Sequence, residues 1–153
     1  MKKKIAILGS TGSIGKTTIN ILRKDKKNFD VVLLTTNNNY KEILKQINEF
    51  KVKNVIINNH KNYLKIKAKL QKKKINIFNN FQLFKNKFKG KIDFSMSAIS
   101  GLDGLKPTLE LISISRTIAI ANKESIICAW NLIQKKLKKY KTNFIPVDSE
   151  HFS

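Results

Sequence analysis

Cysteine is nearly absent from this sequence, and long apolar runs are absent altogether. The single cysteine, Cys128, excludes an internal disulfide and fits a reducing cytoplasm, and we expect it to be a small buried apolar residue. No run reaches the roughly 18 apolar residues that a membrane span needs. The basic and then apolar start, MKKKIAILGSTG, is too short for a secretory signal. The composition therefore indicates a cytoplasmic globular chain without a membrane partner.

Acidic residues are also scarce, which gives the chain its large positive charge. Lysine and arginine total 31 against 10 aspartates and glutamates, for a formal net charge of +21. A basic face for nucleic acid is one interpretation. However, the lysines are spread along the whole chain, arginine occurs only at Arg23 and Arg116, and no aromatic residues interleave a basic patch as stacking platforms. We interpret the lysines as solvated helix faces and expect no nucleic-acid partner.

Short β-rich runs alternate with lysine-rich segments along the 153 residues. Apolar residues recur at helical spacing between the runs: Ile43, Leu44, Ile47 and Phe50 in one segment, and Ile126, Ile127, Trp130, Ile133 and Leu137 in another. This alternation predicts one doubly wound α/β domain, with a mostly parallel, Rossmann-like sheet and helices on both faces. Trp130 and the phenylalanines within 78–88 are expected in the core. The predicted strands are 4–9, 30–36, 54–58, 75–78, 91–97, 117–121 and 143–148.

Three glycines follow the first predicted strand, in KIAILGSTGSIGKTT at 4–18. A phosphate-binding P-loop and the dinucleotide fingerprint G-x-G-x-x-G both require glycine where Ser10 stands. The chain instead has a G-x-x-G-x-x-G variant between a strand and a helix. In a dinucleotide site, Gly9 would let the chain turn, Gly12 would let the backbone approach a pyrophosphate, and Gly15 would let the helix pack closely. The context favours dinucleotide binding, with a P-loop and a structural tight turn as alternatives.

The end of the second predicted strand bears on which dinucleotide would bind. An NAD site places an acidic residue there to hold the ribose 2′-hydroxyl. Here the strand ends LLTTNNNYKE, so that Asn37, Asn38 and Asn39 offer neutral hydrogen bonds and Lys41 offers a positive charge nearby. The missing carboxylate favours NADP(H). The alternative is that the three asparagines form only a polar loop.

Polar residues also follow the sixth and seventh predicted strands. Asn122 is equally compatible with a hydrogen bond to a cofactor and with the cap of the next helix, while Lys123 is suited to a substrate phosphate. Asp148 and Glu150 occupy alternate strand positions, which lie on one face about 7 Å apart. Two carboxylates so placed suit Mg²⁺ or Mn²⁺. An exposed acidic turn is the alternative.

Taken together, these segments resemble one family, 1-deoxy-D-xylulose-5-phosphate reductoisomerase, the NADPH-dependent enzyme of non-mevalonate isoprenoid synthesis. The resemblance rests on four segments in the family's order and spacing: ILGSTGSIG at 7–15, SAISGLDGLKPTL at 97–109, ANKES at 121–125 and PVDSEH at 146–151. Two positions depart from it. Some members have lysine where Asn38 stands, and Asp103 stands where small residues are common.

The resemblance also implies a role for individual residues. The cofactor-binding residues would be Thr11, Gly12, Ser13, Ile14, Asn37, Asn38, Asn39, Asn122 and Glu124. Lys123, Ser149 and Glu150 would bind the substrate, Asp148 and Glu150 would hold the metal ion, and Lys123 and Glu150 would be catalytic. The implied cofactors are NADPH and Mg²⁺ or Mn²⁺, the substrate is a small sugar phosphate, and a full-length member is expected to be a homodimer.

The implied reaction converts 1-deoxy-D-xylulose 5-phosphate into 2-C-methyl-D-erythritol 4-phosphate. The metal ion would stabilise the oxyanion that develops as the carbon skeleton rearranges, and NADPH would then deliver hydride. The resemblance also implies that residues 1–153 form the NADPH-binding domain and the start of the catalytic region, without the remaining catalytic and C-terminal helical domains. We therefore expect this chain alone to bind NADPH weakly, to associate, and to show no turnover.

Overall fold

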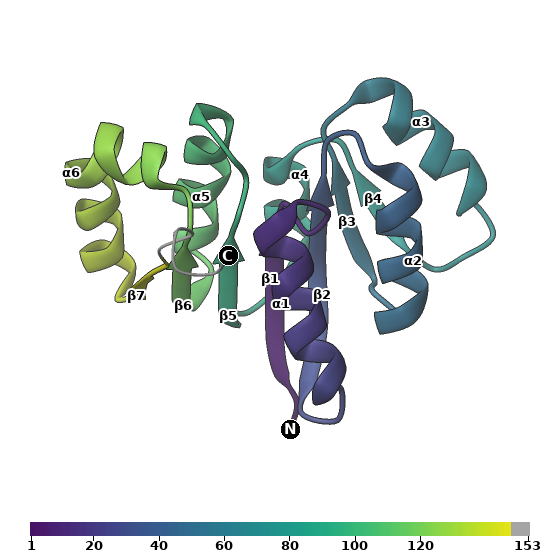
Figure 1. Ribbon diagram of the computed structural model, residues 1–153, viewed down its shortest axis with the longest axis horizontal. Coiled ribbons are helices and arrows are strands. Elements are labelled where there is room, and N and C mark those ends of the chain that lie inside the picture. Colours follow the sequence, from purple (N-terminus) through teal and green to yellow (C-terminus); the bar gives the residue numbers. More distant parts are fainter. Residues whose placement is uncertain (148–153) are drawn as a thin grey trace.

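A single sheet of seven parallel strands organises the computed structural model, which describes residues 1–147 (Figure 1). The strand order is β4-β3-β2-β1-β5-β6-β7. The strands are β1 (Lys3–Leu8), β2 (Phe29–Thr36), β3 (Asn54–Ile57), β4 (Asn76–Phe78), β5 (Ile92–Ser97), β6 (Ser115–Ile120) and β7 (Asn143–Pro146). The helices are α1 (Ser13–Lys24), α2 (Tyr40–Phe50), α3 (His60–Lys69), α4 (Phe81–Lys87), α5 (Leu105–Ile112) and α6 (Lys123–Tyr140), with a 3₁₀ turn, η1 (Leu102–Gly104).

The sequence of connections reverses direction between β1 and β5. From β1 the chain builds outward through β2, β3 and β4, and it then returns to place β5 against the other side of β1. In sheets of this kind, ligands bind outside the carboxyl ends of the strands at such a reversal. All strands run upward in Figure 1, so this edge lies at the top of the view.

Helices cover both faces of the sheet, each over its own apolar core. Helices α1, α2 and α3 bury Ile19, Ile43, Ile47 and Ile66 against one face. Helices α4, α5 and α6 bury residues that include Phe84 against the other face (Figure 1). Because β1 and β2 are covered on both faces, they contain the continuous apolar runs Ile5–Leu8 and Val31–Leu34. The predicted doubly wound fold and all seven predicted strands are confirmed.

Helix α6 departs from the single amphipathic helix that the spacing predicts. Its backbone leaves helical geometry at Ala129, with φ of −138° and ψ of 27°, which interrupts the apolar periodicity. Ile127 is therefore 77% exposed and Cys128 is also exposed, so the prediction that Cys128 is buried is wrong. Trp130 is half-buried and packs against Phe144, with ring centroids 5.4 Å apart. Of the helices in residues 1–147, none is long and apolar enough to cross a membrane.

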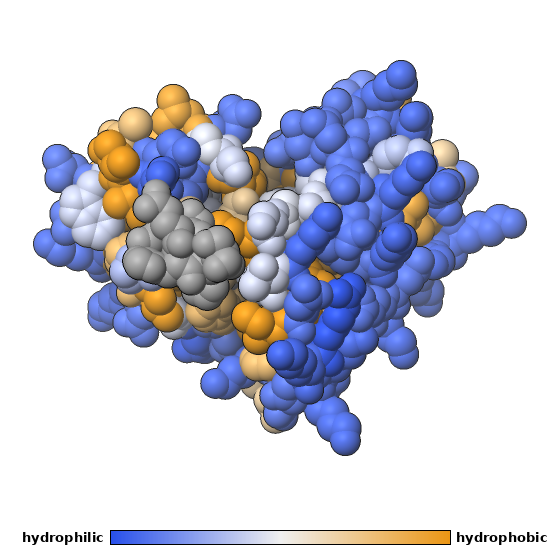
Figure 2. All heavy atoms as spheres, viewed as in Figure 1, coloured by the Kyte–Doolittle hydropathy of each residue, from blue (hydrophilic) through white to orange (hydrophobic). Residues whose placement is uncertain are grey.

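Hydrophilic residues cover most of the face seen in Figure 2, and apolar residues show at its upper left and along its middle. The exposed apolar side chains include Leu102 of η1 and Ile127 of α6, two elements that contact each other. Most lysines are exposed along the whole of residues 1–147, as the sequence predicts, while Leu102 and Ile127 lie near the carboxyl edge of the sheet.

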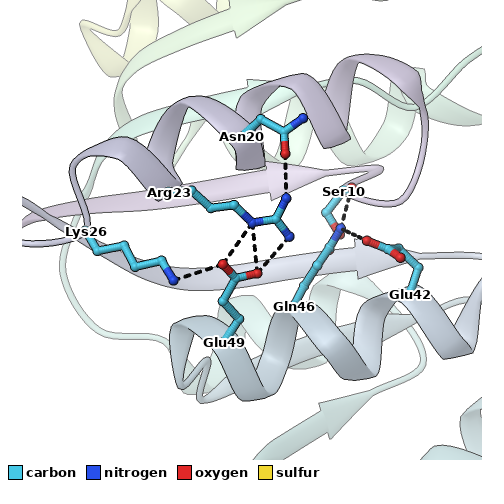
Figure 3. A network of polar contacts seen from close by, with 7 residues as sticks. All are labelled: Ser10, Asn20, Arg23, Lys26, Glu42, Gln46 and Glu49. Atoms are coloured by element: carbon cyan, nitrogen blue, oxygen red, sulfur yellow. Dashed lines mark hydrogen bonds and ion pairs between the residues drawn. The ribbon is translucent and has the colours of Figure 1, made fainter.

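An ion pair joins the far ends of α1 and α2 (Figure 3). The Arg23 Nη2 atom lies 2.7 Å from Glu49 Oε2, and Arg23 Nε donates to Glu49 Oε1 at 2.8 Å. The Lys26 ammonium lies 2.9 Å from Glu49 Oε1. Hydrogen bonding from Arg23, helped by Lys26, lowers the pKa of Glu49 from its ordinary 4.5 to about 2.

This lowered pKa predicts a specific pH dependence of stability. A carboxyl whose pKa is lower in the folded state stabilises the fold above its unfolded pKa and loses that contribution as the pH falls towards 2. Replacing Glu49 with Gln should reduce the free energy of unfolding by about 0.5–1 kcal/mol at pH 7, since the pair is partly exposed. Urea unfolding should show the difference from the parent chain shrinking between pH 5 and pH 2. A difference that is independent of pH would contradict the assigned ion pair.

Candidate dinucleotide-binding site

Four loops meet at the carboxyl edge of the sheet, and the predicted site residues that the structure describes lie in these loops or in the helix turns that follow them. They follow β2, β1, β5 and β6, which are consecutive neighbours in the sheet, and two of them run directly into helices α1 and α6, whose first turns carry Ser13, Ile14, Lys123 and Glu124. The loops comprise residues 37–39, 9–12, 98–104 and 121–122. Strands lie about 4.8 Å apart, so the two outer loops are separated by about 14 Å along the edge. The fold therefore brings together segments that are more than 100 residues apart in sequence.

The glycine-rich turn after β1 is fixed to the end of β2. The Gly9 amide donates to Thr35 Oγ1 at 2.8 Å, and the Ser10 amide donates to the Thr35 carbonyl at 3.0 Å. Thr11 Oγ1 lies 2.7 Å from Thr36 Oγ1 in a hydroxyl–hydroxyl hydrogen bond. Sequence reasoning missed both threonines. The available signal was a pair of hydroxyl residues at the end of the strand that precedes the three asparagines.

Two of the three glycines are required by the packing of the protein itself. Gly9 has a φ of +76°, and a Cβ there would lie 2.7 Å from the Ala98 carbonyl oxygen. A Cβ on Gly15 would lie 2.6 Å from the Ser10 Cα atom and would also meet the Gly9 carbonyl oxygen. The atoms in both contacts belong to the backbone, which cannot move aside as the end of a flexible side chain can. The roles expected for Gly9 as a turn and for Gly15 as a close helix contact agree with this geometry.

Gly12 differs from both, because the surrounding described residues leave space for a side chain at this position. Its φ is −78°, and the nearest atom to an added Cβ is the Gly9 carbonyl oxygen at 3.5 Å, an ordinary contact. Gly12 is exposed and forms the N-cap of α1 without a side-chain hydrogen bond to the helix. The first amides of a helix have no acceptor within it and carry a partial positive charge. The turn thus presents an uncapped helix start beside an open backbone position, which suits an anionic ligand.

The loop that follows β2 is exposed, and α3 supports it. The Asn62 side chain of α3 donates from Nδ2 to the Asn38 carbonyl at 3.1 Å. Asn39 caps α2, its Oδ1 accepting from the Glu42 amide at 3.1 Å. The Lys65 ammonium lies 5.4 Å from the centre of the Tyr40 ring. The side chains of 37–39 carry no charge at this edge, and lysines of α2 and α3 lie close by.

Asn122 has a structural role that accounts for its side-chain amide. It is 2% exposed and donates from Nδ2 to the carbonyls of Ile99 and Gly101 at 2.6 and 2.7 Å. Its Oδ1 accepts from the Ser125 amide at 2.9 Å and so caps α6. A Cβ on Gly104 would lie 2.6 Å from the Ile99 carbonyl oxygen and would also meet Asn122 Nδ2, which leaves room there only for glycine. The capping interpretation is confirmed, and a contact between Asn122 and a cofactor stays a prediction.

The remaining predicted residues divide into two groups. Ser13, Lys123 and Glu124 are exposed in the first turns of α1 and α6, while Thr11 and Ile14 are partly buried at the turn. Asp148, Ser149 and Glu150 lie outside the described residues. Within residues 1–147, no group of three His, Cys, Asp or Glu side chains is placed to hold a metal ion. The described residues therefore include the cofactor candidates and Lys123 but neither of the two predicted metal carboxylates.

The doubly wound sheet, the glycine turn at its reversal and the uncapped helix start define a Rossmann-like fold. Comparison with known proteins makes the assignment more specific. The family model for 1-deoxy-D-xylulose 5-phosphate reductoisomerase matches residues 5–130. The chain belongs to this family, and the resemblance seen in the sequence is confirmed.

Relatives of known name give the extent of the match. The 1-deoxy-D-xylulose 5-phosphate reductoisomerase of Pelagibacter ubique is 58% identical over 153 residues, which cover 99% of this chain and 39% of that protein. The reductoisomerase of Caldanaerobacter subterraneus is 38% identical over 149 residues, covering 97% of this chain and 39% of the relative. The chain thus spans about two fifths of the length of these curated relatives.

Solved structures of similar proteins have the same fold. The reductoisomerase of Zymomonas mobilis in complex with NADPH superposes with a TM-score of 0.88 at 30% identity, covering 99% of this chain and 40% of that one. A reductoisomerase in complex with NADPH, fosmidomycin and magnesium gives a TM-score of 0.87 at 30% identity, covering 97% of this chain and 37% of the other.

The different surroundings of Gly12 and Gly15 predict that the same substitution changes stability by very different amounts at the two positions. Gly15→Ala places a methyl group against backbone atoms, so the free energy of unfolding should fall by more than about 3 kcal/mol. Gly12→Ala meets only an ordinary contact at a compatible φ and should change it by less than about 1 kcal/mol. Urea unfolding of the two variants beside the parent chain measures both. Similar losses at Gly12 and Gly15 would contradict the assigned turn geometry.

Proposed function

We propose that this chain binds the pyrophosphate of NADPH at its glycine turn, as the cofactor half of a reductoisomerase. The observation that carries the proposal is that packing does not require glycine at position 12, whereas a bound pyrophosphate would. An added side chain there would occupy the space in front of the first amides of α1. The residues present therefore fit the cofactor, and Thr11, Gly12, Ser13 and Ile14 would hold it.

The loop after β2 supports NADPH over NADH. A carboxylate at this position would repel a 2′-phosphate, and Asn37, Asn38 and Asn39 provide none. Asn62 holds the Asn38 carbonyl, so the loop is fixed before a cofactor arrives. Lys41 in α2 lies next to this loop in the sequence and would supply the charge that lysine at the position of Asn38 supplies in some family members.

We further propose that the protein converts 1-deoxy-D-xylulose 5-phosphate into 2-C-methyl-D-erythritol 4-phosphate. When bound, NADPH supplies the hydride, and Mg²⁺ or Mn²⁺ supplies a Lewis acid for the rearrangement. The donor set fits a hard cation, because Asp148 and Glu150 offer carboxylate oxygens. Lys123 and Ser149 would bind the sugar phosphate, with Lys123 and Glu150 as catalytic groups. Asn122 would fix the start of α6, which carries Lys123 and Glu124.

Membership of this family also supports a proposal for the domain organisation, oligomeric state and location of the protein. Residues 1–153 would form the NADPH-binding domain and the beginning of the catalytic region, since more than half of the length of the relatives lies outside the match. We propose a cytoplasmic homodimer without a nucleic-acid partner for the full-length protein. The scarcity of arginine and the scattered lysines support the last point.

A chimera tests the proposed activity. In it, residues 1–153 replace the matching segment of the Pelagibacter ubique relative, which is 58% identical. The purified chimera should oxidise NADPH when given 1-deoxy-D-xylulose 5-phosphate and Mg²⁺ or Mn²⁺, with kcat/KM at least tenfold higher for NADPH than for NADH. The 153-residue chain alone should show no turnover, because two carboxylates do not complete the roughly six oxygen ligands of such an ion.

The control for this experiment is the chimera that carries Gly12→Val. This variant should lose NADPH binding and turnover while its melting temperature stays near that of the parent chimera, because the added side chain fills only the ligand's place. A folded chimera without substrate-dependent NADPH oxidation would contradict the proposed function. Unchanged NADPH affinity in Gly12→Val would contradict the assigned cofactor turn.

A further inference from the structure

A polar side chain lies within the apolar core directly beneath the glycine turn. Gln46 sits in the middle of α2 and is 0% exposed, next to the fully buried Ile43 and Ile47. Its Nε2 atom donates to the Ser10 carbonyl at 3.0 Å and to Glu42 Oε1 at 3.3 Å (Figure 3). Its Oε1 atom is buried and has no hydrogen-bond partner among residues 1–147. Gln46 thus connects the second helix to the turn.

Stability alone does not account for glutamine at this position. Burying an amide oxygen without a donor costs free energy, and an apolar side chain of similar size would fill the same space without that cost. The neighbouring core positions of α2, Ile43 and Ile47, are apolar. Gln46 is therefore better explained by what its Nε2 atom holds than by the packing of the core.

The hydrogen bond to Ser10 determines how one peptide group of the turn is oriented. A trans peptide is planar, and its carbonyl and amide hydrogen point in opposite directions. The carbonyl of Ser10 points towards Gln46 in α2, so the amide of Thr11 in the same peptide points away from α2. Thr11 belongs to the turn that would surround the pyrophosphate. Fixing the Ser10 carbonyl thus fixes the direction of a potential phosphate-binding amide.

Gln46 is also linked, through Glu42, to the loop after β2. Glu42 accepts from Gln46 Nε2, and the backbone amide of Glu42 donates to Asn39 Oδ1. A continuous path of hydrogen bonds therefore joins the asparagine loop to the glycine turn through α2. The two loops are the ones that would receive the 2′-phosphate and the pyrophosphate of NADPH.

We propose that Gln46 is a positioning residue for cofactor binding, which holds the Ser10–Thr11 peptide in the orientation that receives the pyrophosphate. This inference rests on the proposed function. It assigns a role to a residue that does not itself touch the cofactor, and it predicts that cofactor affinity and stability respond separately to substitution at this position.

The test compares Gln46→Met with Glu49→Gln in the 153-residue chain. Met has a similar length but no donor, so NADPH affinity in an NMR titration should fall about three- to tenfold, the value of one hydrogen bond. The melting temperature should fall by only a few degrees, because removal of the orphaned Gln46 oxygen offsets part of the cost of leaving the Ser10 carbonyl without its donor. Glu49 lies on the same helix and joins it to α1 away from the turn (Figure 3). Glu49→Gln should lower the melting temperature and leave NADPH affinity unchanged.

A second measurement does not depend on the folding of a variant. In the parent chain, the side-chain amide signals of Gln46 should shift when NADPH is added, while those of the exposed Gln82 should not. Equal NADPH affinity in the parent and in folded Gln46→Met, or an unmoved Gln46 signal at saturation, would overturn the inference. Failure of the parent chain to bind NADPH at all would instead contradict the proposed function.

Discussion

The close approach of helix α1 to the end of strand β1 is the constraint on which the site depends. Gly15 makes it possible, because any side chain there would meet the backbone of Gly9 and Ser10. The approach brings the first amides of α1 to the carboxyl edge, at the point where the sheet reverses direction between β1 and β5. Thr35, Thr36 and Gln46 then hold the turn from β2 and α2. The geometry of the proposed anion-binding turn is thus set by contacts within the fold.

The fold could be predicted from the sequence because each strand and most helices are marked by the pattern of apolar residues within their own segment. Seven apolar runs alternate with amphipathic segments, and each run became a strand within a few residues of its expected bounds. The same local reasoning failed at Ile127 and Cys128, where the kink at Ala129 interrupts the helical period. No residue in the sequence near Ala129 signals that departure, since neither glycine nor proline occurs there.

Only those features of the candidate site that depend on residues adjacent in the sequence could be predicted. The spacing of Gly9, Gly12 and Gly15 indicated the turn, but their different roles required the positions of neighbouring backbone atoms. The role of Asn122 depends on carbonyls 21 and 23 residues away, and that of Gln46 on a carbonyl 36 residues away. Such long-range hydrogen bonds leave no periodic signal. The predicted metal carboxylates, Asp148 and Glu150, lie outside the described residues.

The most direct test of the account is to map NADPH onto the chain by the NMR shifts of its backbone amides. NADPH bound at the glycine turn should give the largest shifts on residues 9–15 and 37–39, with smaller ones at 99–101 and 122–124. These segments share one edge of the sheet. Shifts spread over lysine-rich surfaces such as 51–53 and 72–74, and reproduced by ATP at the same concentration, would show only charge attraction. That result would contradict a dinucleotide site at the glycine turn.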